Sequence, residues 1–211
     1  MPTSILTPKQ QEILGVLGKT SLLRQFYLAG GTALALHLGH RRSVDFDFFR
    51  RSRFNATATL AKLEKHGVTR VLLHDINTLT VRFEGVKLSF FHHPPPLISK
   101  RKRTAGGLIA AGVADIAAMK IAAICGRGSR KDFIDLYAIC TTRYSLREVV
   151  RFFQQKYRAS GYDLYHVQRS LVYFDDAEKD VMPRMLVVVN WEDVKEFFRE
   201  QTASTFNWSP L

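Results

Sequence analysis

A short hydrophobic segment that carries two aspartates constrains the chain most. Residues 44–49 read Val-Asp-Phe-Asp-Phe-Phe, which is typical of a short strand. Side chains alternate along a strand, so Asp45 and Asp47 are predicted to share one face, while Val44, Phe46 and Phe48 point into a core. Two like charges on one face repel each other. Something nearby must therefore offset that cost, and a divalent cation or the basic pair Arg41 and Arg42 could do so.

A glycine turn precedes this segment by the length of a helix. Gly30-Gly31-Thr32 opens the apolar stretch 32–38, which is predicted to be a buried helix. The first amides of a helix and its dipole favour an anion such as a phosphate. Mg²⁺ takes oxygen ligands and commonly shares them between carboxylates and phosphates. Neither the turn nor the acidic pair is specific alone. Together they predict a triphosphate–metal site, in which Asp45 and Asp47 hold Mg²⁺ or Mn²⁺.

The charge balance favours a polyanionic partner. The chain of 211 residues has a formal net charge of +12 and a pI near 10, which points to nucleic acid, nucleotides or an acidic protein. A generally basic protein is the open alternative. No apolar run is long enough to span a bilayer and no signal-peptide pattern begins the chain, so a cytoplasmic location without a membrane partner is expected. The basic residues gather in three clusters: Arg41, Arg42, Arg50, Arg51 and Arg53; residues 100–103; and Arg127, Arg130 and Lys131.

The pattern of elements predicts an α+β protein. Residues 1–98 are expected to form an α/β core with a small mixed sheet, in which Glu84-Gly85 makes the tight turn of a hairpin. Residues 99–211 are expected to form a helical region that completes the active site. Its apolar helix covers 113–125, the next covers 130–140, and Ser145 with Glu148 forms a capping box for a third.

The segment "GGTALALHLGHRRSVDFDFF" resembles motif I of the polymerase-β-like nucleotidyltransferase superfamily. More narrowly, the chain resembles the AbiEii/AbiGii toxin family of nucleotidyltransferases, known from type IV toxin–antitoxin and abortive-infection systems. The segments "ADIAAMKIAAICGRGSRKDFIDLYAI", "LVYFDDAEKDVMPRML" and "WEDVKEFF" are similar to the family's C-terminal part. The resemblance implies the nucleotidyltransferase fold followed by a helical C-terminal region.

The resemblance also implies a set of site residues. Gly30, Gly31 and Thr32 match the turn that holds the triphosphate, and Asp45 and Asp47 match the metal ligands. Lys120 matches a helical lysine that contacts nucleotide phosphates, while Asp132 and Asp135 match two acids of the following helix, Asp135 being the favoured catalytic group. The residues alone leave alternatives open: Lys120 could extend along a helix rim, and the two acids could pair with Arg127, Arg130 or Lys131.

One position departs from the superfamily pattern. Many relatives carry a third carboxylate on a later strand, and Ser89 stands where that acid is expected. Serine neither holds a metal as a carboxylate does nor acts as a base at neutral pH. The departure puts in question the two-metal mechanism and the identity of the base, for which His92 or Asp135 could substitute.

The function that follows is a metal-dependent nucleotidyl transfer. A nucleoside triphosphate is the expected donor, and the resemblance implies an RNA end, favouring tRNA, as the acceptor. It also implies that the protein is a toxin with a cognate antitoxin. The alternatives are a catalytically impaired member that binds nucleotide or RNA, and a transferase that modifies a protein side chain. An Asp-x-Asp phosphatase is disfavoured, because Arg41-Arg42-Ser43 stands where that pattern requires a buried apolar strand.

Overall fold

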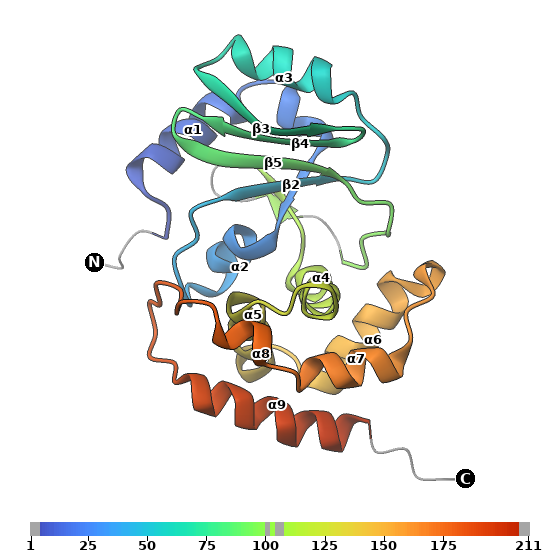
Figure 1. Ribbon diagram of the computed structural model, residues 1–211. Coiled ribbons are helices and arrows are strands. Elements are labelled where there is room, and N and C mark those ends of the chain that lie inside the picture. The colour runs from blue at the N-terminus through green and yellow to red at the C-terminus, as the bar shows by residue number, and fades with distance from the viewer. Residues whose placement is uncertain (1–4, 100–101, 104–107, 207–211) are drawn as a thin grey trace. The chain divides into compact units, whose positions relative to one another are not determined.

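The computed structural model describes residues 5–99, 102–103 and 108–206 (Figure 1). The chain divides into two compact units, Met1–Gly112 and Val113–Leu211. The sequence placed this division after residue 98. The difference arises because Ile109–Ala110 pairs with a strand of the first unit, so the chain leaves that unit only after this pairing.

The first unit, called unit 1 below, combines helices with one mixed sheet. Its elements in chain order are α1 (Pro8–Gly18), η1 (Leu22–Gln25), β1 (Tyr27–Ala29), α2 (Gly30–Leu38), β2 (Phe46–Arg50), α3 (Ala56–Glu64), β3 (Thr69–Asp75), β4 (Thr78–Phe83), β5 (Val86–His92), β6 (Lys102–Arg103) and β7 (Ile109–Ala110).

Within the described residues the strands form one sheet in the order β3-β4-β5-β2-β1-β7-β6. The pairs β2–β5 and β1–β7 are parallel, whereas β1–β2, β3–β4, β4–β5 and β6–β7 are antiparallel. Glu84 and Gly85 both have positive φ, which a two-residue hairpin turn requires. The predicted hairpin is therefore confirmed. The short pair β6 and β7 was not predicted, and Lys100 and Arg101 of the predicted basic loop lie outside the described residues.

Alternation along the strands places a set of large apolar side chains on one face of the sheet, away from Asp47. Phe46, Phe48, Leu88 and Phe90 are fully buried on one face, and the rings of Phe48 and Phe90 stack at 5.2 Å. Val44 does not join them, because it lies before β2 and is 68% exposed. The prediction that Val44 enters the core is wrong, since the strand begins two residues later.

Helices cover both faces of this sheet (Figure 1). α3 contacts β3 and β4 on the core face, and α2 contacts β1 and β2 on the opposite face. The predicted capping box of α1 is present, because Thr7 accepts from the Gln10 N–H and Gln10 accepts from the Thr7 N–H. The Gln10 side chain also donates to the Ser43 carbonyl at 2.9 Å, so α1 holds the segment that leads into β2.

The second unit, called unit 2 below, is helical in the part of it that the structure describes. Its elements are α4 (Val113–Gly126), α5 (Arg130–Thr142), α6 (Leu146–Lys156), η2 (Arg158–Ser160), α7 (Leu164–Leu171), α8 (Asp175–Glu178) and α9 (Trp191–Thr205). The apolar helix α4 packs against α5, α6 and α7, and α9 packs against α5, α6 and α7 as well. Phe133 anchors this core through ring contacts with Phe174 and Phe198. The Ser145–Glu148 capping box at the start of α6 is confirmed.

Candidate active site

Asp47 lies against the glycine turn that opens α2. It stands on β2 opposite Ala29 of β1, the residue that precedes Gly30. Gly30 has a φ of +68°, and a Cβ built on it would come within 2.6 Å of Asp47 Oδ2. Only glycine therefore suits this position on both counts. The glycine brings the backbone of the α2 first turn and the Asp47 carboxylate next to each other.

The Thr32 side chain fixes the backbone of Asp45. The Thr32 hydroxyl donates to the carbonyl oxygen of Asp45 and lies 2.8 Å from the Ser43 hydroxyl. Thr32 is 1% exposed, and its hydroxyl contacts other protein groups. Within this turn the side chain of Thr32 positions the acidic segment, and the backbone N–H groups remain for a phosphate. No side chain caps the first turn of α2, because its N-cap residue is Ala29.

The neighbours of the acidic pair on β5 are Lys87 and Ser89. Asp47 is in register with Ser89, and Lys87 Nζ lies 3.8 Å from Asp45 Oδ2. Both Lys87 and Asp45 are more than a third exposed, so this ion pair is weak. Ser89 is buried and its hydroxyl lies 3.4 Å from that of Thr80. The register thus puts Ser89 directly beside Asp47, at the place where the superfamily resemblance leads one to expect an acid.

Arg41 adds a second positive group beside the α2 first turn. Its side chain is 5% exposed, and a Cβ at Gly31 would overlap its guanidinium. The guanidinium also donates to the carbonyl oxygen of Arg42 at 3.0 Å. The N-terminus of a helix is itself the positive end of the dipole. A buried arginine at that end combines two features that favour an anion.

A second group of predicted residues gathers inside unit 2. Lys120 of α4 is 5% exposed, and its Nζ lies 2.9 Å from Asp132 Oδ1 and 2.5 Å from Asp135 Oδ2, both on α5. Asp132 also accepts two hydrogen bonds from Arg127, at 2.8 and 3.0 Å, and one from Ser129 at 2.6 Å. Lys120 therefore does not extend along a helix rim. It is enclosed by two carboxylates, a pairing that was not predicted. Of the partners that the sequence offered for these acids, Arg127 pairs with Asp132.

The protonation of this group follows from its contacts. Burial lowers the pKa of Lys120, but the carboxylates of Asp135 and Asp132 outweigh it, and the pKa lies above its ordinary value. Burial raises the pKa of Asp132, but Lys120, Arg127 and Ser129 outweigh it, and the pKa lies well below its ordinary range. Lys120 and Asp132 are thus both charged at neutral pH.

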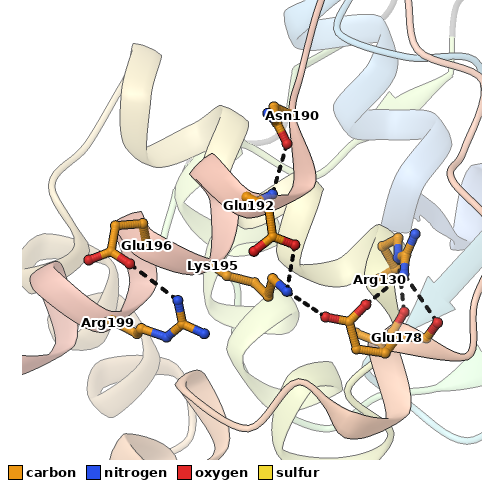
Figure 2. Close-up of polar contacts among 8 residues, drawn as sticks. Arg130, Glu178, Asn190, Glu192, Lys195, Glu196 and Arg199 are labelled. Atoms are coloured by element: carbon orange, nitrogen blue, oxygen red, sulfur yellow. Dashed lines mark hydrogen bonds and ion pairs between the residues drawn. The ribbon is translucent and has the colours of Figure 1, made fainter.

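Arg130 is committed to holding helices together. It pairs with Glu178 at 3.1 Å and lies over the Trp191 ring at 4.9 Å, while Lys195 pairs with Glu178 at 2.7 Å. Figure 2 shows this network across α5, α8 and α9. The sequence grouped Arg130 with Arg127 and Lys131 as one basic cluster. Of these three, Arg127 and Lys131 keep exposed side chains.

The predicted site residues therefore fall into two groups, one in each unit. Gly30, Gly31, Thr32, Asp45 and Asp47 lie together in unit 1, and Lys120, Asp132 and Asp135 lie together in unit 2. Sequence reasoning did not foresee the Lys87–Asp45 ion pair, the burial of Arg41, or the fully buried pair Lys156–Asp115 at 2.8 Å. The sequence signal for the Lys156–Asp115 pair was a single acid, Asp115, near the start of the apolar helix α4.

The fit of a metal ion to unit 1 can be judged from the donor set. Among the described residues, no group of three or more His, Cys, Asp or Glu side chains is placed to hold a metal. Asp47 provides a carboxylate beside the uncapped turn at Gly30, and Asp45, one residue before β2, is fixed to the same turn through its backbone carbonyl. Two carboxylates suit Mg²⁺ when phosphate oxygens and water supply the other ligands. The residues present therefore fit a metal that arrives with a triphosphate.

A comparison with protein families identifies the family of the chain. Residues 13–207 match the family described as "Nucleotidyl transferase AbiEii toxin, Type IV TA system". This chain belongs to the AbiEii family. An uncharacterized protein of Aquifex aeolicus strain VF5 is 36% identical over 200 residues, which are 93% of this chain and 95% of that protein. The predicted membership and the enzyme class, nucleotidyltransferase, are confirmed at the level of this family.

A solved structure supports the fold of this AbiEii member. MenT4, a nucleotidyltransferase toxin from Mycobacterium tuberculosis H37Rv, matches with a TM-score of 0.67 and 18% identity, covering 95% of this chain and 82% of that chain. At that identity the likeness supports the fold alone. The predicted nucleotidyltransferase fold is confirmed by it. In the described part of the chain, no helix has the length and apolar character needed to cross a bilayer.

Proposed function

We propose that this protein transfers a nucleotidyl group from a nucleoside triphosphate to an RNA end, with tRNA as the favoured acceptor, and releases pyrophosphate. One observation carries the proposal: the Asp47 carboxylate packs on Gly30, in front of a helix turn that no side chain caps. A carboxylate and a phosphate repel each other, so an acid beside an anion site is favourable when a cation binds to both. In the biological role that the family name implies, the protein is a toxin restrained by a cognate antitoxin.

The triphosphate is assigned to the first turn of α2. The backbone N–H groups of Gly30 and Gly31 provide donors, the helix dipole favours negative charge, and Arg41 adds a buried guanidinium beside Gly31. These groups would hold the β- and γ-phosphates. Thr32 contributes by fixing the Asp45 backbone through its hydroxyl.

Mg²⁺, or Mn²⁺ in its place, is assigned to Asp45 and Asp47. When bound, such an ion stabilises negative charge that develops on the transferred phosphoryl group. In the reaction, a hydroxyl oxygen of the acceptor forms a bond to the α-phosphorus, and the bond from that phosphorus to the bridging oxygen of the β-phosphate breaks. The hydroxyl proton passes to a base, and pyrophosphate leaves.

Lys120, Asp132 and Asp135 are assigned supporting roles in unit 2. Two buried carboxylates hold the Lys120 ammonium charged and fixed. For Lys120 and Asp135 we propose the roles that the family resemblance implies, namely contact of Lys120 with the nucleotide phosphates, and orientation of a reacting group or assistance in proton removal by Asp135. Asp132 anchors both Lys120 and Arg127, so it acts through these two cations.

A second candidate is a member that binds nucleotide without turnover. Ser89 favours it, because a serine stands beside Asp47 where the resemblance implies a third carboxylate. Binding of triphosphate without incorporation would then be the whole activity. The protein-modifying alternative has no observation of its own in the structure.

The test is incorporation of label from each α-³²P nucleoside triphosphate into total tRNA, with Mg²⁺, with Mn²⁺ and with EDTA. Wild type should label RNA only with a divalent cation, and Asp45→Asn and Asp47→Asn should reduce labelling by at least about a hundredfold. The matched control is Asp75→Asn on the edge strand β3, which should keep full activity. Absence of label with all four nucleotides, together with metal-dependent stabilisation by triphosphate, would favour the second candidate.

A further inference from the structure

Unit 2 contains a cavity of about 450 Å³ that the proposed chemistry does not use. It lies between the end of α4 and helix α7, and its polar lining includes Arg127, His166, Arg169, Ser170, Tyr173 and Asp176. A second cavity of about 360 Å³ is lined by Arg127, Ser129, Lys131, Asp180, Val181 and Pro183. Arg127 is a lining residue of both cavities. We call the first one the α7 cavity and the second one the Lys131 cavity.

Basic side chains outnumber acidic ones in the lining of both cavities. Arg169 and Lys131 are exposed, and neither has an ion pair or side-chain hydrogen bond within the described residues. The two acids are already engaged: Asp176 pairs with Lys179 at 2.9 Å, and Asp180 accepts from the Arg130 backbone N–H at 3.0 Å. Three cations, Arg169, Arg127 and Lys131, thus line the two cavities together with two acids, of which Asp180 has a neutral N–H group as its partner.

The C-terminal end of α4 borders the α7 cavity, and part of it is engaged by hydrogen-bond donors. The Ala123 carbonyl accepts from the N–H groups of Arg127 and Gly128. The Cys125 carbonyl lies 3.3 Å from His166 Nε2, which joins α7 to the end of α4. Two of the carbonyl groups at this end of the helix therefore have donors.

An aromatic ring completes the α7 cavity. Tyr173 is 52% exposed and makes no ring contact within the described residues. Ile124 and Val172 add apolar surface to the lining. An unpartnered ring next to an unpaired arginine is the combination that holds a base by stacking and its phosphate by charge.

We propose that the α7 cavity and the Lys131 cavity together bind a single-stranded segment of the acceptor RNA, with a base stacked on Tyr173 and phosphates on Arg169, Arg127 and Lys131. The inference rests on the proposed function for the identity of the strand as acceptor. A cavity of this volume lies within the range of small-ligand sites, about 300–1,000 Å³. Cations in both cavities indicate a ligand longer than one nucleotide.

The experiment measures binding of a fluorescein-labelled oligouridylate of about twelve nucleotides by fluorescence anisotropy, with EDTA and without nucleoside triphosphate. Arg169→Ala and Tyr173→Ala should each weaken binding about tenfold. The matched controls are Arg151→Ala, an exposed arginine on α6, and Tyr165→Ala, a 63% exposed tyrosine on α7; neither residue lines a cavity described above. Both controls should bind within about twofold of wild type.

Salt dependence separates the two contributions. Arg169→Ala and Lys131→Ala should each reduce the slope of log K against log salt by about one, whereas Tyr173→Ala should leave the slope unchanged. Tyr173→Phe should keep wild-type affinity, because it keeps the ring. The melting temperature of each variant confirms that the fold is kept.

Several results would overturn the inference. They are absence of oligouridylate binding by wild type, wild-type affinity in Arg169→Ala and Tyr173→Ala, or an equal loss in the two controls. Competition by polyglutamate with the same dependence on Tyr173 would also overturn it, since it would indicate an acidic protein partner. The assay contains no triphosphate, so the two proposals fail separately: the expected variant pattern without label incorporation would refute the transfer and leave the RNA site standing.

Discussion

Gly30 has a left-handed backbone, and Asp47 Oδ2 occupies the space in front of its Cα. A side chain there meets two separate penalties, one from the backbone and one from the carboxylate. Gly39, which ends α2, has nearly the same φ of +67° but nothing within 4 Å of a built Cβ. The two glycines therefore allow the backbone penalty to be separated from the effect on the acidic group.

Gly39→Ala should lower the free energy of unfolding by about 1–2 kcal/mol and keep transferase activity. Gly30→Ala should cost more than that and should also abolish labelling, because the methyl group displaces Asp47. Urea denaturation and the labelling assay measure the two effects. Equal loss of stability with retained activity in Gly30→Ala would refute the assignment of Asp47.

The Lys120 group makes a prediction about pH. The pKa of Asp132 is lowered, so its stabilisation exists above the unfolded pKa near 3.9 and is lost as the pH falls through and below that value. The pKa of Lys120 is raised, so its stabilisation exists below the unfolded pKa near 10.4 and is lost as the pH rises past the folded value. Both contributions are therefore present between about pH 4 and pH 10.

Lys120→Met should lower the free energy of unfolding by about 3–5 kcal/mol at pH 7, because it leaves buried carboxylates without their ammonium. The loss should shrink as the pH is lowered toward 4.5, since the stranded carboxylates can then take up protons. Urea denaturation at both pH values measures it. Lys131→Met, at an exposed lysine of the same unit, should change stability by less than about 0.5 kcal/mol. A loss that grows on acidification would contradict the account.

Among the elements, β5 sets the neighbours of the acidic pair. Its parallel register with β2 puts Ser89 beside Asp47 and Lys87 near Asp45. A third carboxylate at Ser89 would be buried next to a like charge, which a divalent cation could relieve. The strand thus offers a direct test of the proposed metal position.

Ser89→Asp should lower the melting temperature in EDTA by about 6–12 °C, which corresponds to a loss of about 3 kcal/mol in a chain of this size. Mg²⁺ or Mn²⁺ should restore much of this loss. Ser89→Asn is the matched control, and its melting temperature should respond to the cations no more than that of wild type. Equal cation effects in the Asp and Asn variants would place the metal elsewhere.

The helices and strands also show which parts of the fold could be predicted from the sequence. Local signals predicted α1, the β4–β5 hairpin, α4, α5 and α6, because capping boxes, turn residues and apolar periodicity act over a few residues. The pair β6 and β7 was not predicted, since two-residue strands have no periodicity and depend on a distant partner, β1. Lys120 could be singled out by its apolar surroundings, but its two carboxylate partners are set by the packing of α4 on α5, which no local pattern encodes.

In the whole molecule, the basic residues behind the net charge of +12 have different structural roles. Arg130 and Lys195 hold helices together, Arg41 lies buried beside a helix terminus, and Lys120 is enclosed by acids. Arg169 and Lys131 remain unpaired among the described residues and line cavities. Composition favoured a polyanionic partner or a generally basic protein, and of the residues named here Arg169 and Lys131 are the exposed ones.

The central claim is that a nucleotidyl group, and no other part of the triphosphate, reaches the acceptor. It is tested most directly by parallel reactions with α-³²P and γ-³²P forms of the nucleotide that the protein prefers, followed by separation of RNA, pyrophosphate and phosphate. We expect the α label to move to RNA and the γ label to pyrophosphate in equal amounts, and Asp47→Asn to abolish both. The γ label on RNA or in free phosphate, with no α label on RNA, would contradict it.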